Sequence, residues 1–141
     1  MHIAKKTIIM KWIITLLLAI TFMTYGNSQD KIGQLSKEEK SFKSQSGEKI
    51  TGEVGSFTVP ENWDNPDSEI ISVRFVRLKS SNPNPQAPLI YLEGGPGSSC
   101  TWQAEDPDYL NYWAQFLAVG DVILYDQRGT GQSSQRLTYI W

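Results

Sequence analysis

A short glycine-rich stretch offers the clearest chemistry in this sequence of 141 residues. The stretch is Leu92-Glu-Gly-Gly-Pro-Gly-Ser98, and it follows an apolar run that begins at Leu89. Glycine admits backbone angles that are closed to other residues, whereas proline fixes one angle and removes an N–H donor. A loop of this kind can turn bare N–H groups outward at the end of a strand, which is where open α/β sheets bind ligands. The stretch therefore predicts a loop whose backbone N–H groups bind a ligand.

The nucleophilic side chains near this loop have no base to activate them. Four serines lie in or beside glycine-containing loops: Ser98, Ser99, Ser133 and Ser134. The only histidine in the sequence is His2, so neither a Ser-His-Asp triad nor a Cys-His pair can form near them. We therefore interpret the serines as turn or capping residues and Cys100 as a small, partly buried thiol. A single cysteine also excludes an internal disulfide and a structural zinc site, and no metal site is predicted.

A second loop, Asp126-Gln-Arg-Gly-Thr-Gly-Gln-Ser133, follows another apolar run that ends at Tyr125. It does not match a dinucleotide fingerprint, because Ser134 occupies the third glycine position and the acidic residue precedes the glycines. No Gly-Lys-Ser/Thr follows to make a phosphate-binding P-loop. We therefore expect no cofactor, and we interpret Asp126 and Arg128 as braces of a tight turn beside the first loop.

Together the two loops resemble those of the proline iminopeptidase-like branch of the α/β-hydrolases, which includes exported tripeptidyl aminopeptidases. The family motifs are a Gly-Gly-Pro-Gly loop, often preceded by histidine, and an Asp-Gln-Arg-Gly-x-Gly-x-Ser loop. The stretch Phe57-Thr-Val-Pro-Glu-Asn-Trp63 also looks like the opening of the exported members, so the resemblance covers roughly residues 50 to 136. Glu93 stands where the histidine is often found, which fits an exported relative better than a cytosolic proline iminopeptidase. The implied fold class is α/β. The chain would be the N-terminal portion of an α/β-hydrolase fold, incomplete, with an antiparallel strand pair followed by parallel strands and a crossover helix.

The resemblance implies serine acyl transfer that releases amino acids or short peptides from an N-terminus, without a cofactor. In such hydrolases the loop after the third strand supplies one oxyanion N–H. Here Gly95 is the first choice and Gly94 the second, since Pro96 has no N–H. Glu93, Pro96 and Gly97 would line the site for a peptide or a small amide or ester substrate.

The triad of this family lies C-terminal to both motifs in the order Ser, Asp, His. No G-x-S-x-G elbow is found in the sequence, so we expect a chain truncated before the nucleophile and inactive alone. An esterase or another α/β-hydrolase, and a non-catalytic exported binding module, remain alternatives. The sequence gives no prediction of substrate specificity or oligomeric state.

The elements that must position these loops follow from hydrophobic periodicity. Strands are expected near 53–59, 69–79, 88–93 and 121–126, and a helix near 107–118. Asp106 is the expected N-cap, with Pro107 at the first helical position and an apolar stripe from Leu110 to Leu117. The first two strands should pair antiparallel, and the last two should be parallel. The strand near 88–93 should be buried on both faces, because Leu89 to Leu92 is apolar throughout. Trp63 is expected to pack over the antiparallel pair.

Residues 1 to about 28 have the pattern of an export signal, in which Lys5, Lys6 and Lys11 precede an apolar run from Trp12 to Met23. The run is shorter than the ~20 apolar residues of a membrane span. We therefore predict a cleaved signal and an exported protein, periplasmic or secreted, with an uncleaved tether as the alternative and no other membrane contact.

Composition and charge give the predictions for the linker and for nucleic-acid binding. Residues 29–48 are polar and are predicted to be a solvated linker, ahead of the hydrolase part at 49–141. The formal net charge is −2, and it becomes more negative without the lysines of the signal. A mildly acidic chain lacks the basic surface that nucleic-acid binding needs, so no nucleic-acid partner is expected.

Overall fold

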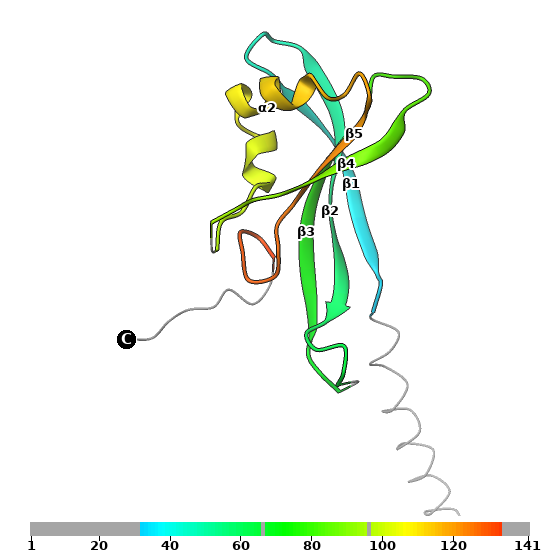
Figure 1. The fold of residues 1–141 in the computed structure, drawn as a ribbon, viewed down its shortest axis with the longest axis vertical. Coiled ribbons are helices and arrows are strands. Elements are labelled where there is room, and N and C mark those ends of the chain that lie inside the picture. Colours follow the sequence, from blue (N-terminus) through cyan, green and yellow to red (C-terminus); the bar gives the residue numbers. More distant parts are fainter. Residues whose placement is uncertain (1–31, 66, 96, 134–141) are drawn as a thin grey trace, which may run out of the picture. The chain divides into compact units, whose positions relative to one another are not determined.

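The computed structural model describes residues 32–65, 67–95 and 97–133, so the predicted export signal lies outside the described residues. From Gly33 onward the chain forms one compact unit. Its elements, in chain order, are β1 (Leu35–Lys43), β2 (Lys49–Pro60), β3 (Ile70–Leu78), β4 (Gln86–Leu92), the 3₁₀-helix η2 (Thr101–Ala104), α2 (Pro107–Ala114) and β5 (Gly120–Tyr125) (Figure 1). No helix among these described residues is both long and apolar enough to cross a bilayer.

The five strands form one mixed, open sheet in the order β1-β2-β3-β5-β4. The pairs β1–β2, β2–β3 and β3–β5 are antiparallel, and β4 runs parallel to β5. Both predicted pairings are therefore confirmed, and β5 joins them by lying between β3 and β4. The described residues make a mostly β structure with one short α-helix.

The strand β1 corrects the prediction of a solvated linker at 29–48. It pairs with β2 over nine positions, from Leu35 opposite Phe57 to Lys43 opposite Lys49. Every side chain of β1 except Phe42 is exposed, so the segment lacks the apolar alternation that predicts a strand. Backbone hydrogen bonds to β2 hold it, together with cross-strand ion pairs such as that of Lys37 with Glu53 at 2.9 Å.

The helices η2 and α2 pack on one face of the sheet and close its core. Asp106 caps α2 as predicted, because its carboxylate accepts hydrogen bonds from the backbone N–H groups of Asp108 and Tyr109. Leu110, Trp113 and Leu117 are buried against the strands, which confirms the predicted stripe. The α-helix ends at Ala114 instead of 118, because Phe116 and Leu117 donate to carbonyls three residues back in 3₁₀-type turns.

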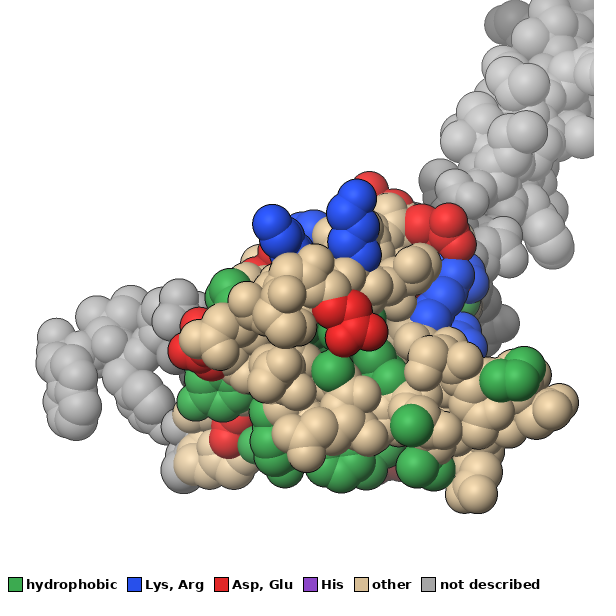
Figure 2. Space-filling model, turned by 90° about the horizontal axis from the view of Figure 1, so that it is seen from above, with side chains coloured by type: hydrophobic (Ala, Val, Ile, Leu, Met, Phe, Trp, Pro, Cys, Tyr) green, Lys and Arg blue, Asp and Glu red, His purple; other side chains and the backbone are tan. Residues whose placement is uncertain are grey.

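The opposite face of the sheet is uncovered at its β4 edge among the described residues. We predicted β4 to be buried on both faces, and this is wrong: Ile90 is 62% exposed and Leu92 53% exposed. The error arises because β4 is the last strand of the sheet and no described layer lies over this face. Six apolar side chains line an open hollow there: Phe57, Phe75, Ile90, Leu92, Ile123 and Tyr125. Figure 2, seen from the end where α2 lies, shows hydrophobic side chains gathered along one side of the described surface.

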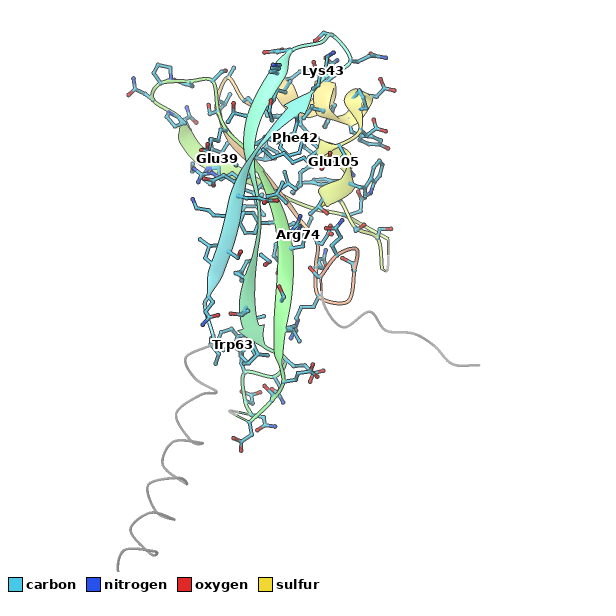
Figure 3. The ribbon with its side chains drawn as sticks, turned by 180° about the vertical axis from the view of Figure 1, so that it is seen from behind. Glu39, Phe42, Lys43, Trp63, Arg74 and Glu105 are labelled. Carbon is cyan, nitrogen blue, oxygen red and sulfur yellow. The ribbon has the colours of Figure 1, made fainter. Side chains whose placement is uncertain are left out.

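Trp63 does not cover the antiparallel pair as predicted. Its side chain is 70% exposed, in the turn between β2 and β3. Figure 3 shows it at the end of the long strands remote from Phe42 and Glu105. The aromatic stacking in that part of the sheet comes instead from Phe57, whose ring lies 6.0 Å from that of Tyr125.

The uncovered apolar hollow leads us to expect self-association of the chain. Exposed apolar sheet surface and an unpaired edge strand both promote aggregation. Ile90→Lys should lower the oligomeric fraction in sedimentation velocity, because it places a charge in the hollow. Val119→Lys is the matched control, since Val119 is similarly exposed at 52% but lies outside the hollow. A monomeric parent chain with a sharp cooperative melt would contradict this prediction.

A charge cluster across β1, β2 and β3 gives the fold a pH dependence. Glu53 lies 2.9 Å from Lys37 Nζ, 3.4 Å from Arg77 Nη1 and 3.5 Å from Lys79 Nζ. The hydrogen bond from Lys37 lowers the pKa of Glu53 below its ordinary value of 4.5, against the opposing effect of burial. The ionised carboxylate therefore stabilises the folded state above about pH 4.5, and this contribution is lost as the pH falls through the lowered pKa.

Glu53→Gln should consequently be less stable than the parent at pH 7 by about 1 kcal/mol or less, because the cationic partners are partly solvated. The difference should shrink as the pH is lowered towards 3. Urea unfolding of both proteins across this range measures it. A difference in the free energy of unfolding that stays constant with pH would show that the charge of Glu53 does not act in this way.

Candidate functional site

The two glycine-containing loops lie at the same end of the sheet, where β4 and β5 finish. The first follows β4 and the second follows β5, and the carboxyl ends of these adjacent parallel strands point the same way. Gly95 and Gly97 have φ angles of +71° and +84°, which favour glycine, and the Ser98 N–H donates to the Gly95 carbonyl at 3.2 Å. The predicted turn after β4 is thus present. Pro96 lies outside the described residues.

Asp126 joins the second loop to the first. Its side chain is completely buried, and the carboxylate accepts four hydrogen bonds. Oδ1 accepts from the backbone N–H groups of Cys100 and Thr101, each at 2.9 Å. Oδ2 accepts from Thr101 Oγ1 at 2.8 Å and from the Gln132 N–H at 3.1 Å. The predicted bracing role of Asp126 is confirmed, and the segment directly after the glycine loop is fixed in position.

Gly131 is required by the close packing around this carboxylate. A Cβ atom at Gly131 would lie 2.2 Å from Asp126 Oδ2 and 2.5 Å from Ser99 Cβ. Its φ of +51° also disfavours a side chain. Only glycine allows the second loop to approach both Asp126 and the first loop this closely.

Arg128 braces a different part of the molecule from the one predicted. Its Nη1 donates to the backbone carbonyl of Glu61 at 2.6 Å, so it ties the second loop to the end of β2 and not to the first loop.

The backbone N–H groups of Gly94 and Gly95 in the first loop differ in whether they already donate a hydrogen bond. The Gly94 N–H donates to Glu93 Oε1 at 3.2 Å. The Gly95 N–H has no hydrogen-bond partner among the described residues, and both glycines are exposed. Among the described residues, the Gly95 N–H is therefore available to a ligand. The Gly94 N–H could bind a ligand only after its hydrogen bond to the Glu93 carboxylate is broken.

Glu93 belongs to a polar network that the sequence did not reveal. Its Oε2 accepts from Gln103 Nε2 at 2.8 Å and from the Tyr91 hydroxyl at 3.3 Å. Gln103 Oε1 in turn accepts from Trp113 Nε1 at 3.1 Å. Burial and the nearby Glu93 carboxylate raise the pKa of the Tyr91 hydroxyl, which keeps it a donor. No sequence motif predicts the role of Gln103, because that role depends on the position in which η2 places its side chain.

The Ser133 hydroxyl and the Cys100 thiol have structural roles. Ser133 Oγ donates to the Asp126 carbonyl at 2.7 Å and accepts from the Arg74 N–H at 2.8 Å, as expected of a turn residue. Cys100 is fully buried, which raises the pKa of its thiol, and Sγ donates to the Tyr125 carbonyl at 3.3 Å. Ser134 lies outside the described residues. Within the described part of the chain, no three His, Cys, Asp or Glu side chains are grouped to hold a metal ion.

Comparison with known proteins leaves the family open. No protein-family model matches this chain, and no curated protein matches it. The structure itself defines a mixed, open sheet with a glycine loop at the end of its parallel strands and a buried aspartate that fixes the segment directly after this loop.

Proposed function

We propose that this chain carries the oxyanion-binding part of an exported serine hydrolase of the aminopeptidase type with an α/β-hydrolase fold. One observation carries the proposal. The N–H of Gly95, which has no hydrogen-bond partner among the described residues, lies at the carboxyl end of a parallel strand, in a loop whose following segment is fixed by the buried Asp126. Ligands of open α/β sheets bind at such strand ends, and the hydrolases take one oxyanion donor from this position.

The loop would act on the charge that develops during acyl transfer. When a serine oxygen attacks the substrate carbonyl carbon, the carbonyl oxygen becomes an oxyanion, and the Gly95 N–H would donate to it. A preorganised donor of this kind lowers the barrier by about 3–4 kcal/mol, because it needs no reorganisation as the charge forms. The Asp126 contacts would supply that preorganisation by fixing Cys100 and Thr101.

The nucleophile and its base would come from outside these 141 residues. The only histidine in the sequence is His2, within the predicted signal, and no G-x-S-x-G elbow is present. Ser133 is engaged in the second loop, and Cys100 is buried. The chain therefore contributes substrate binding and oxyanion stabilisation in this account, and not the nucleophile.

The proposal is tested with the protein that the gene produces in its natural host. The product is captured from the exported fraction with an antibody raised against residues 33–133. Aminoacyl and tripeptidyl arylamides with free N-termini should be hydrolysed, and N-acetylated versions should not. Preferential hydrolysis of p-nitrophenyl esters would point to the esterase alternative. A captured product with neither activity would contradict the hydrolase proposal.

A further inference from the structure

A second candidate site lies beside the glycine loop, between η2 and α2. Four aromatic rings and two polar side chains line a hollow of about 450 Å³: Tyr91, Gln103, Asp108, Tyr109, Tyr112 and Trp113. This volume is in the range of small-molecule sites. An adjoining hollow shares Tyr91, Gln103 and Tyr109 with it and adds Trp102 and Glu93. The two hollows together form a continuous aromatic surface next to Glu93.

Two of the rings in the hollow are about half exposed, although the rings contact one another. Tyr109 is 44% exposed and Tyr112 is 51% exposed. Trp102 stands edge-on to Tyr109 at a centroid distance of 4.9 Å and 75°, and Tyr112 stands edge-on to Trp113 at 4.9 Å and 74°. In each of these pairs the edge of one ring covers part of the face of the other, so the exposed parts of Tyr109 and Tyr112 are what a ligand can contact. Exposed aromatic rings attract ammonium groups through the negative potential of their faces.

The rigid side of the hollow is held by hydrogen bonds. Trp113 Nε1 donates to Gln103, which donates to Glu93, and Trp102 Nε1 donates to the Ser99 carbonyl at 2.9 Å. The indole rings are thereby anchored before any ligand arrives. Preorganisation of this kind lowers the entropic cost of binding.

The charged side chains that line the two hollows are all acidic. Glu93 and Asp108 line the two hollows, and no lysine or arginine does. Neither carboxylate forms an ion pair among the described residues, whereas the neighbouring Glu105 is paired with Lys40. Figure 2 shows the Lys and Arg side chains gathered on the side of the described surface opposite to most of the hydrophobic ones. An acidic aromatic surface without its own cation is complementary to a cationic ligand and repels anions.

We propose that this aromatic hollow binds an organic cation, a substituted ammonium ion, against the exposed rings of Tyr109 and Tyr112. Glu93 and Asp108 supply the complementary charge. The inference uses residues of this chain alone and does not require that the protein be a hydrolase. The ammonium group can come from a quaternary compound or from a primary amine, and the test separates these sources.

The test is saturation-transfer NMR on the full 141-residue chain, which detects weak binding even to large particles. The probes are choline, n-butylammonium and 3,3-dimethylbutan-1-ol, the last being a neutral compound of the same shape as choline. Choline should bind saturably with a millimolar dissociation constant, and the neutral alcohol should bind much more weakly. Binding of n-butylammonium as well identifies a general amine site, and its absence identifies a quaternary site.

Matched variants locate the binding. Tyr112→Leu should weaken choline binding about two- to fivefold, the effect of one exposed cation–π contact, whereas Tyr112→Phe should retain it. Glu93→Gln should also weaken binding of both cations. Trp63→Leu is the control, because Trp63 is an exposed aromatic at the other end of the sheet. Melting temperatures confirm that each variant is folded. Equal binding of the neutral alcohol, or unchanged choline binding by a folded Tyr112→Leu, would overturn the proposal.

Discussion

Asp126→Ala should destabilise the protein by about 3–5 kcal/mol, a large part of the stability of a domain of this size. The substitution leaves four donors without their acceptor, of which the three from Cys100 and Thr101 are buried, whereas Gln132 is exposed. Each buried donor without a partner costs about 1–3 kcal/mol, although the costs are not additive. The midpoint of urea unfolding measures the loss.

Gln127→Ala is the matched control for Asp126. Gln127 is the next residue along the loop, and its exposed side chain donates one hydrogen bond, to the Glu93 carbonyl at 3.2 Å. Its removal should cost about 1 kcal/mol or less, since water can replace this partner. Equal stability losses for the two variants would show that the buried carboxylate does not hold the loops together.

In the proposed hydrolase, Gly95→Ala should reduce kcat by roughly a hundredfold or more. Gly95 has a φ of +71°, so a side chain would strain the backbone and tilt the amide away from the proposed oxyanion. Loss of one oxyanion donor has this magnitude in acyl-transfer enzymes. KM should change much less, because the donor acts mainly where charge develops. Steady-state kinetics on an aminoacyl arylamide measures both constants.

Gly129→Ala separates the loss of the donor from backbone strain. Gly129 has a φ of +76°, close to that of Gly95, but it lies in the second loop. The two variants should lose similar stability, and Gly129→Ala should keep kcat per folded molecule. A stable Gly95→Ala enzyme with normal kcat would remove the oxyanion role assigned to this loop.

The elements predicted correctly are those with a strong local signal. The alternation of Ile71, Val73 and Phe75 with polar residues predicts β3. Asp106 and Pro107 predict the N-terminus of α2. The bracing role of Asp126 follows locally only in its contact with the Gln132 N–H, because its three other donors come from Cys100 and Thr101 in the first loop. These features depend on the chain near them and little on the rest of the fold.

The errors concern features that distant contacts decide. β1 consists of polar residues, and it is a strand because the edge of β2 pairs with it. The exposure of Ile90 depends on the place of β4 in the sheet order, which no local pattern encodes. Gln103 joins the site only because η2 places it between Trp113 and Glu93. The loop residues of the candidate site could thus be predicted, but the network behind them could not.

The most direct test of the central claim is to map a fluorophosphonate adduct by mass spectrometry on the protein isolated from its natural host. Fluorophosphonates react with the activated serine of serine hydrolases. We expect one labelled serine outside the 141 residues of this sequence, in a G-x-S-x-G context, and no label on Ser98, Ser99, Ser133 or Ser134. Absence of any adduct on folded protein, or an adduct on one of these four serines, would contradict the account.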